Sequence, residues 1–367
     1  MRVVVNCSFV VPGVVGGTEE FSVRLLRSVL AHQSDVEIGI VAQRRFFEVY
    51  PDLAFRAVGS LRGPASNRAY RVAAESLWLP TRTKLADVTH HFGGRIPTRH
   101  STPAVVTVHD IQPLDHPENF SAAKAAFLAR SLPRTVRQAA VVCTPTRWVA
   151  ERVIERLAVD PGKVRVVGPG LGPRPTVSHR ERVPRELRHR RIVLFPGITH
   201  PHKNHVTLIR AMVKVRERVP DAVLVLTGGR GAADDRVAAV THRVDPDGTL
   251  VRHLGRVDES LLRGLFAEAH VLAFPSRYEG FGLPVLEAMQ AGTAVVAAAA
   301  TCLPEVVGDA GVLVDVDDVE QWADGIVSIL EDDEHRARLA MQGALRAEGF
   351  GPEVAASRLV DTWRACC

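Results

Sequence analysis

Residues 271–292 read VLAFPSRYEGFGLPVLEAMQAG, and this stretch predicts a strand, a loop and a helix in succession. Its first part is a short apolar run of the kind that forms a buried strand. Pro284 suits the first turn of a helix, where its missing N–H is not needed, and Gly292 suits the helix end. We therefore expect a helix over Pro284–Gln290 whose N-terminus faces the loop.

The predicted helix start is a candidate phosphate site. The N–H groups of Phe281, Gly282 and Leu283 precede the helix body, and such a helix end binds anions. Glu279 lies in the loop, and Glu287 lies about one turn into the helix. Because a carboxylate repels phosphate, we interpret both side chains as acceptors for ribose or sugar hydroxyls. The segment predicts a ligand with a central diphosphate and a hydroxylated ring at each end.

The string PSRYEGFGLPVLEAM (residues 275–289) resembles the E-x7-E signature of retaining glycosyltransferases of the GT-B fold, especially glycosyltransferase family 4, also called group 1. An ordinary strand-loop-helix with two surface glutamates is the alternative, because two Glu at this spacing also arise by chance. The resemblance implies an α/β protein with two doubly wound Rossmann-like domains facing a central cleft. It also implies a C-terminal helix that crosses back to the first domain.

The periodicity of the rest of the chain agrees with two α/β domains. Apolar strands alternate with amphipathic helices in both halves, which is typical of parallel sheets. A stretch rich in Pro, Gly and Arg interrupts the alternation and predicts a linker. We expect an acceptor-side domain over 1–170, a linker over 171–191, a nucleotide-sugar domain over 192–350 and a crossover helix over 351–367.

Strands are expected at 3–5, 36–42, 88–91, 104–109, 139–144, 164–167, 192–196, 222–228, 251–254, 271–275 and 294–298. Helices are expected at 18–31, 122–138, 147–157, 204–219, 259–268, 284–290, 319–330, 334–348 and 352–365.

Composition limits the class and location of the protein. With 367 residues, 46% hydrophobic and 24% charged, the chain is globular. It contains no apolar run of membrane-spanning length. Five cysteines without a C-x-x-C pair fit a reducing compartment. We therefore predict a cytoplasmic protein, with a peripheral position on the inner face of the cell membrane considered because of its charge.

Positive charge is concentrated in the first part of the chain. Residues 1–170 hold 22 Lys and Arg against 14 Asp and Glu, a net charge of +8. No nucleic-acid motif accompanies this charge, so no nucleic-acid partner is predicted. An anionic membrane surface or a polyprenyl or other lipid-linked acceptor is favoured, and a solvated basic face is the alternative. The segment Ala122–Gln138 mixes basic residues with Phe127, Leu128 and Leu132, a pattern typical of interfacial helices.

Three further loops follow predicted strands. Gly16 and Gly17 open the first helix, where paired glycines allow close backbone approach to a ligand. His109 ends a strand, where ligands of α/β sheets bind. Lys203 and Asn204 lie in GITHPHKN (197–204), at the start of a second-half helix. The resemblance implies that His109, Lys203 and Glu279 are catalytic, and that Gly16, Gly17, Asn204, Phe281, Gly282, Leu283 and Glu287 bind the donor. Of His90 and His91, which also end a strand, one is a weaker candidate for the acceptor side.

Metal and cofactor signals are weak. His200, His202 and His205 lack the partners of a zinc motif. Residues 245–247 and 315–317 match D-x-D, but their positions favour loops and helix caps. We therefore predict a metal-independent, retaining hexosyltransferase without a cofactor, acting in polysaccharide biosynthesis with GDP-mannose or a UDP-sugar as donor. Rival hypotheses are a sugar-nucleotide epimerase or phosphorylase on the same fold, and a non-catalytic sugar-nucleotide-binding protein.

Overall fold

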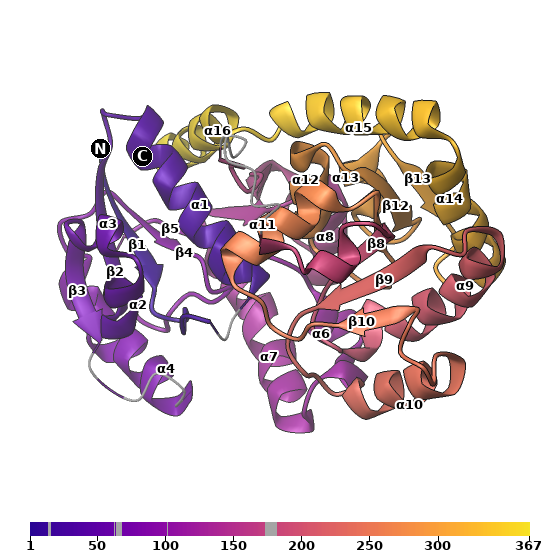
Figure 1. Ribbon diagram of the computed structural model, residues 1–367. Coiled ribbons are helices and arrows are strands. Elements are labelled where there is room, and N and C mark those ends of the chain that lie inside the picture. The colour runs from indigo at the N-terminus through magenta and orange to yellow at the C-terminus, as the bar shows by residue number, and fades with distance from the viewer. Residues whose placement is uncertain (14–15, 62, 64–67, 101, 173–181) are drawn as a thin grey trace. The chain divides into compact units, whose positions relative to one another are not determined.

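The computed structural model describes residues 1–13, 16–61, 63, 68–100, 102–172 and 182–367. It divides the chain into two units, Met1–Gly172 with Phe350–Cys367, and Pro173–Gly349. Each unit is built on one parallel sheet (Figure 1). The predicted linker 171–191 lies partly outside the described residues. Its described part packs into the second unit, because Val183 and Leu187 are buried there.

The first unit contains a seven-stranded sheet in the order β3-β2-β1-β4-β5-β6-β7, with every pair parallel. Its strands are β1 (Arg2–Cys7), β2 (Glu37–Gln43), β3 (Ala57–Leu61), β4 (Val88–His91), β5 (Ala104–Thr107), β6 (Val141–Thr144) and β7 (Val164–Val166). Its helices are α1 (Gly17–His32), α2 (Arg44–Val49), α3 (Pro51–Ala54), α4 (Arg68–Leu77), α5 (Leu79–Arg82), α6 (Gln112–Asp115), α7 (Ala122–Gln138), α8 (Arg147–Leu157) and α16 (Pro352–Arg364). Short 3-10 turns cover Pro117–Asn119 and Pro161–Lys163.

The second unit contains a six-stranded parallel sheet in the order β10-β9-β8-β11-β12-β13. Its strands are β8 (Arg191–Pro196), β9 (Ala222–Thr227), β10 (Val251–His253), β11 (Val271–Phe274), β12 (Ala294–Ala298) and β13 (Val312–Val314). Its helices are α9 (His205–Arg218), α10 (Asp234–Val244), α11 (Glu259–Glu268), α12 (Leu283–Ala291), α13 (Leu303–Val307), α14 (Val319–Glu331) and α15 (Asp333–Glu348). Short 3-10 turns cover Arg185–Leu187 and Pro201–Lys203.

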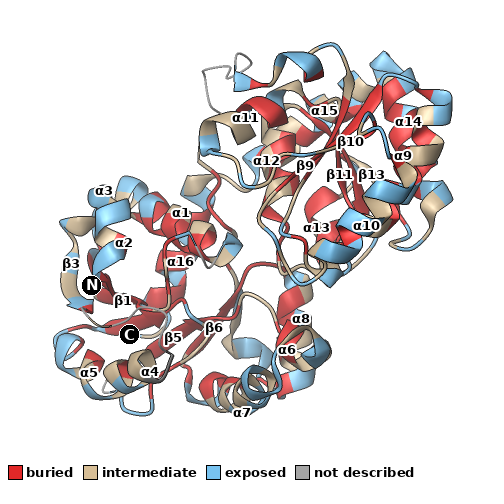
Figure 2. Ribbon diagram, turned by 60° about the horizontal axis from the view of Figure 1, so that its bottom comes forward, coloured by how far each residue is buried: buried red, intermediate tan, exposed pale blue. Residues whose placement is uncertain are grey.

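Both sheets are buried on two faces, and helices form the outer layers (Figure 2). Continuous apolar runs such as Val3–Val5 and Val193–Phe195 form the central strands, as expected when helices cover both faces of a parallel sheet. The starts of some helices are fixed by side-chain caps. The Thr146 hydroxyl accepts from the Val149 N–H at the start of α8, and the Asp258 carboxylate accepts from the Leu261 N–H at α11.

The last helix belongs to the first unit. Helix α16 packs against α1, and in Figure 1 the yellow α16 lies beside the indigo α1. The indole of Trp363 is fully buried, and its Nε1–H donates to His90 Nδ1 at 3.0 Å. His90 Nε2 lies 2.8 Å from the Thr107 hydroxyl. His90 thus joins α16 to β4 through Nδ1 and β4 to β5 through Nε2, and both of its ring nitrogens have protein partners.

Two of the apolar residues that suggested an interfacial face on α7 pack against the core instead. Leu132 is buried in the core beneath the sheet, and Leu128 packs against the same core. Lys124, Arg130 and Arg137 remain exposed. Leu128 and Leu132 thus serve the fold of the first unit, and an interfacial position of this helix stays a prediction. Within the described residues, no helix combines the length and apolar character needed to cross a membrane.

Candidate functional site

The strand order of the second sheet identifies its ligand-binding end. The order reverses direction between the neighbouring strands β8 and β11, and ligands of open α/β sheets bind outside the carboxyl ends of the strands at such a point. The loop over residues 197–204 follows β8, and the loop over 275–282 follows β11. The two motifs chosen from the sequence therefore follow the two strands at this point.

Lys203 and Glu279 meet there as an ion pair. Lys203 Nζ lies 2.5 Å from Glu279 Oε1 and 5.5 Å from the centre of the Phe274 ring. The two side chains are only 20% and 14% exposed. The Glu279 backbone N–H donates to the Thr301 hydroxyl at 3.2 Å. Thr301 has a φ of 52°, a strained value for a β-branched residue, which marks this loop as tightly specified.

The side chain of Asn204 braces the loop that carries Lys203. Its Nδ2 donates to the Val316 carbonyl at 2.8 Å, and its Oδ1 accepts from Thr207 Oγ1 at 2.8 Å and from Arg277 Nη2 at 3.0 Å. Asn204 is in the left-handed region, at φ 56°, which Asn tolerates better than most residues. Protein groups therefore already bond to its amide. A contact between Asn204 and the nucleotide sugar would come in addition to these three hydrogen bonds.

Arg277 is a residue that the sequence analysis missed. Its guanidinium pairs with both carboxylate oxygens of Asp317, and its backbone N–H donates to the His202 carbonyl at 2.7 Å. Together with Asn204, it fixes the backbone on both sides of Lys203. In the sequence, Arg277 stands only at the variable third position of PSRYEG (275–280). Its position alone did not indicate that it holds two loops together.

The start of α12 has the geometry expected of an anion site. Gly282 is the N-cap with a φ of 88°, where a Cβ would lie 2.8 Å from Leu303 Cδ2, so glycine is required. The side chains of Phe281 and Leu283 are buried. Glu287 is half-buried in the second turn of the helix. The helix begins one residue earlier than predicted and ends at Ala291, capped by Gly292.

The three histidines near Lys203 do not converge. His200 and His202 stack with ring centres 5.7 Å apart, whereas His205 is buried against Phe195 at 4.6 Å. Burial lowers the pKa of His205 to about 4. Among the residues that the structure describes, no group of three His, Cys, Asp or Glu side chains could hold a metal ion.

The D-x-D segments form turns. The buried Asp245 carboxylate accepts from the backbone N–H groups of Thr249, Leu250 and Val251 at 2.8–2.9 Å. Burial raises its pKa, but these hydrogen bonds outweigh burial and hold the pKa below its usual value. The Asp315 carboxylate accepts from the Asp317 N–H at 2.9 Å. Both segments hold loops in place.

His109 follows β5 in the first unit and is held in one tautomer. Its Nε2 lies 2.9 Å from the Phe92 carbonyl, and because a carbonyl only accepts, Nε2 carries the proton. Its ring meets Phe21 edge-on at 5.1 Å. Burial lowers the pKa of His109 to about 4, so the imidazole is neutral at physiological pH. Nδ1 then carries a lone pair that can accept a hydroxyl hydrogen.

Gly16 and Gly17 begin α1 as predicted. Gly16 is the N-cap with a φ of 71°, and a Cβ on either glycine would meet no described atom within 4 Å. Glu19, in the first turn, accepts from the Gly13 N–H at 3.0 Å and from the Tyr50 hydroxyl at 2.7 Å. Burial and the Glu19 carboxylate both raise the pKa of Tyr50. Glu19 thus holds the loop before α1 in place.

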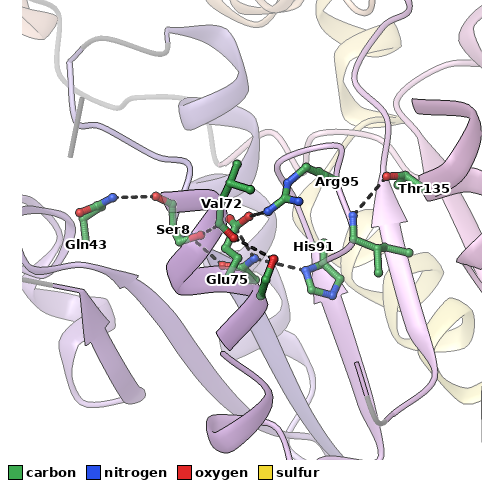
Figure 3. A network of polar contacts seen from close by, with 10 residues as sticks. Ser8, Gln43, Val72, Glu75, His91, Arg95 and Thr135 are labelled. Atoms are coloured by element: carbon green, nitrogen blue, oxygen red, sulfur yellow. Dashed lines mark hydrogen bonds and ion pairs between the residues drawn. The ribbon is translucent and has the colours of Figure 1, made fainter. Parts of the chain in front are cut away.

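A buried polar network occupies the corresponding end of the first sheet, whose order reverses between β1 and β4 (Figure 3). Glu75 of α4 accepts from the Ser8 hydroxyl at 2.5 Å and pairs with Arg95. Asn6 Nδ2 lies 3.2 Å from His91 Nδ1. His91 Nε2 is buried and, within the described residues, has no hydrogen-bond partner.

Of this network, only His91 was a candidate from the sequence. Asn6 and Ser8 flank the end of the first strand, and Arg95 follows a Gly-Gly turn after β4, so their places at strand ends were available as a signal. Glu75 lies inside a helix far from any strand end in sequence. Only the folded first unit brings its carboxylate to the sheet.

Two family models match the chain. Residues 179–346 match the model described as glycosyl transferases group 1, and residues 16–170 match the glycosyl transferase 4-like domain. Over 277 residues the chain is 33% identical to O-antigen chain mannosyltransferase B of Escherichia coli, covering 71% of this chain and 70% of that protein. It is 31% identical over 237 residues to the D-inositol 3-phosphate glycosyltransferase of Corynebacterium glutamicum, covering 61% of this chain. That match spans 57% of the relative's own length.

Two solved structures share the fold over almost the whole chain. HepE of Anabaena, solved in complex with UDP and glucose, superposes with a TM-score of 0.76 at 19% identity, covering all of both chains. The sucrose-phosphate synthase of Thermosynechococcus elongatus superposes with a TM-score of 0.78 at 19% identity, covering 99% of this chain and 98% of the other. At this identity the likeness concerns the fold.

Proposed function

Because the chain belongs to the group 1 glycosyltransferases of the GT-B fold, we propose that it transfers a sugar, with retention of configuration, from a nucleoside-diphosphate donor to a glycan or lipid-linked acceptor. One observation carries the proposal. Lys203, Glu279 and the start of α12 all follow the two strands at which the second sheet reverses its order. The cation and the helix N-terminus at this place suit a diphosphate. The carboxylates suit the hydroxylated rings on either side of it.

The donor contacts follow from the charges and donors present. The N–H groups at Phe281–Leu283 and the ammonium of Lys203 bind the diphosphate oxygens, which removes the need for a metal. Glu287 accepts hydrogen bonds from the ribose, and Glu279 from the sugar. A mannosyltransferase among the relatives and UDP in a structural neighbour make GDP-mannose and UDP-sugars the donors to test first.

Transfer proceeds on one face of the sugar. The bond between the anomeric carbon and the leaving phosphate oxygen breaks, while the acceptor oxygen bonds to that carbon from the same side. The acceptor proton passes to the departing phosphate oxygen. Lys203 stabilises the charge that develops on the diphosphate. His109, as a neutral acceptor at Nδ1, holds a sugar hydroxyl, and the backbone at Gly16 and Gly17 approaches the ligand closely.

The acceptor belongs to the first unit in this proposal. That unit carries a net charge of +8, which suits a phosphorylated or lipid-diphosphate acceptor. The network of Asn6, Ser8, Glu75, His91 and Arg95 supplies hydroxyl-binding groups at the ligand end of its sheet. The relative named O-antigen chain mannosyltransferase B suggests a growing glycan as the acceptor class.

The test is release of nucleoside diphosphate from a panel of nucleotide sugars, with and without glycan acceptors, in the presence of a chelator. We expect one donor to be consumed without metal. Lys203→Ala should lose on the order of 10²-fold in kcat. Glu287→Ala should weaken nucleoside diphosphate binding by about 2–4 kcal/mol, read by calorimetry.

Three results would contradict the proposal. Interconversion of donors without nucleotide release indicates an epimerase. Tight binding of nucleotide sugars without turnover, with or without an acceptor, indicates a binding protein. Complete loss of wild-type activity on chelation, restored by a divalent ion, rejects metal independence.

A further inference from the structure

The ammonium group of Lys203 already has an anionic partner in the protein alone. Its 2.5 Å contact with Glu279 joins the cation proposed to hold the diphosphate to the carboxylate proposed to hold the sugar. This inference rests on the proposed function. One cation faces two candidate anions, and a diphosphate arriving at Lys203 competes with Glu279 for it.

Hydrogen bonds in the two loops hold Lys203 and Glu279 in place. The backbone before Lys203 is held by the bond from the Arg277 N–H to the His202 carbonyl, and the backbone after it by the side chain of Asn204. Glu279 is held by its N–H bond to Thr301. By contrast, the surface pair Lys214–Glu320 has side chains that are 42% and 68% exposed. Partial burial makes the Lys203–Glu279 attraction stronger than that of an exposed pair.

We propose that Glu279 is a resident counter-ion of Lys203 that makes the site prefer a nucleotide sugar over the bare nucleoside diphosphate. When a nucleotide sugar binds, the diphosphate takes over Lys203, and the sugar hydroxyls donate to the released Glu279 carboxylate. When only the nucleoside diphosphate is present, no hydroxyl compensates Glu279. The carboxylate then repels the phosphate and competes for Lys203, which weakens retention of the product.

In this proposal, the Glu279 carboxylate determines whether the site prefers a nucleotide sugar or a nucleoside diphosphate. A purely structural ion pair would lose stability when broken and would change the affinity for both ligands in the same direction. Removing the charge of Glu279, if it is a counter-ion, changes the two affinities differently. Neutralising it tightens nucleoside diphosphate binding and removes the charged acceptor for the sugar hydroxyls.

The experiment uses Glu279→Gln, which keeps the size of the side chain and removes its charge. Affinities for UDP, GDP and the corresponding nucleotide sugars are measured by calorimetry on the full chain. We expect the nucleoside diphosphate that binds the wild type to bind about threefold to tenfold more tightly. The nucleotide sugar should gain nothing or weaken, so the preference ratio falls. Glu320→Gln removes the same charge from a Lys–Glu pair of the same unit and should leave both affinities unchanged.

A double-mutant comparison distinguishes two effects of Glu279. One is competition with the diphosphate for Lys203, and the other is direct repulsion of the diphosphate. In Lys203→Met there is no cation to release, so adding Glu279→Gln should give a clearly smaller gain in nucleoside diphosphate affinity than in the wild type. An equal gain in both backgrounds overturns the exchange. Weaker or unchanged nucleoside diphosphate binding in Glu279→Gln also overturns it, provided that Lys203→Met weakens binding. If neither Lys203→Met nor Glu287→Ala affects binding, the donor-site assignment itself fails.

Discussion

At the scale of single residues, the two loops of the second unit are held by side chains that need not touch the ligand. Arg277 is the clearest example, because its planar guanidinium binds both Asp317 oxygens and Asn204 while its backbone binds His202. A lysine cannot reproduce this geometry, since it offers a single point charge. The position of Lys203 therefore depends on a residue that a motif search treats as variable.

Replacement of Arg277 by Lys tests this dependence. With Asp317 and Asn204 no longer bridged, Lys203 is less well positioned, and nucleoside diphosphate affinity should fall by about tenfold. Calorimetric titration with UDP or GDP provides the measurement. Arg263→Lys is the control, because Arg263 is an exposed helix residue paired with Glu259 and should leave affinity unchanged. Equal affinities of wild type and Arg277→Lys would show that the brace does not position Lys203.

His205 makes stability depend on pH. Its folded pKa of about 4 lies below the usual 6.5, so below pH 6.5 the unfolded chain binds a proton that the folded chain resists. The contribution of His205 is present above pH 6.5 and is lost as pH falls toward 4. We expect His205→Phe to reduce the loss of unfolding free energy between pH 7 and pH 5 by roughly 2 kcal/mol. Urea unfolding at both pH values measures it.

His242→Gln, which replaces an exposed histidine of the same unit, is the control for the loss of a histidine. An identical pH dependence of His205→Phe and wild type would show that His205 is protonated equally well in both states.

At the scale of elements, the sequence predicted most central strands and long helices, because continuous apolar runs and 3.6-residue periodicity are strong signals. It missed β3 and β13, which lie at sheet edges. Residues 57–61 are half-exposed and include Gly59 and Ser60, so they lack an apolar run. It also missed α2 to α6, α10 and α13, of which several are single turns. Short elements are set by packing partners that a sequence window does not contain.

The candidate site was predicted unevenly for a similar reason. Motif residues such as Lys203, Glu279 and Gly282 stand next to strand ends or helix starts, so local sequence indicates them. Arg277 pairs with Asp317, which is 40 residues away in the sequence. Glu75 pairs with Arg95, which is 20 residues away. The sequence could not show that His90 bonds to α16, because its partner Trp363 lies 273 residues further along the chain.

The junction between α16 and the sheet makes an element-scale prediction. Trp363→Phe removes the indole N–H and leaves His90 Nδ1 buried without its donor, which should cost about 1–3 kcal/mol beyond the loss of volume. Trp322→Phe is a matched control, because Trp322 is also fully buried but its Nε1 has no hydrogen-bond partner within the described residues. Calorimetric unfolding compares the two. Equal losses would mean that the Trp363–His90 bond adds nothing.

At the scale of the whole molecule, charge divides between the two units. The first unit carries +8, and the second carries −3. Because Leu128 and Leu132 of α7 pack against the core, we predict that any attachment of the first unit to a membrane is mainly electrostatic. Such attraction adds about 1 kcal/mol for each basic residue near an anionic surface and is screened by salt.

We therefore expect the protein to sediment with anionic vesicles and not with neutral ones. Binding should be fully reversed near 1 M salt, where the Debye length is about 3 Å. Lys124→Glu combined with Arg130→Glu should reduce it, because both residues are exposed on α7. Salt-resistant binding would instead indicate apolar insertion, and equal, negligible sedimentation with both vesicles would indicate a soluble acceptor.

The return of α16 to the first unit has a consequence for how the chain is made. A ribosome produces α1 early, but it releases the helix that covers α1 only after the whole second unit has been synthesised. At ordinary translation speeds this interval lasts tens of seconds. We expect the second unit, which is continuous in sequence, to reach its native state first. The N-terminal unit then matures last, and the uncovered apolar face of α1 is a natural target for chaperones during biogenesis.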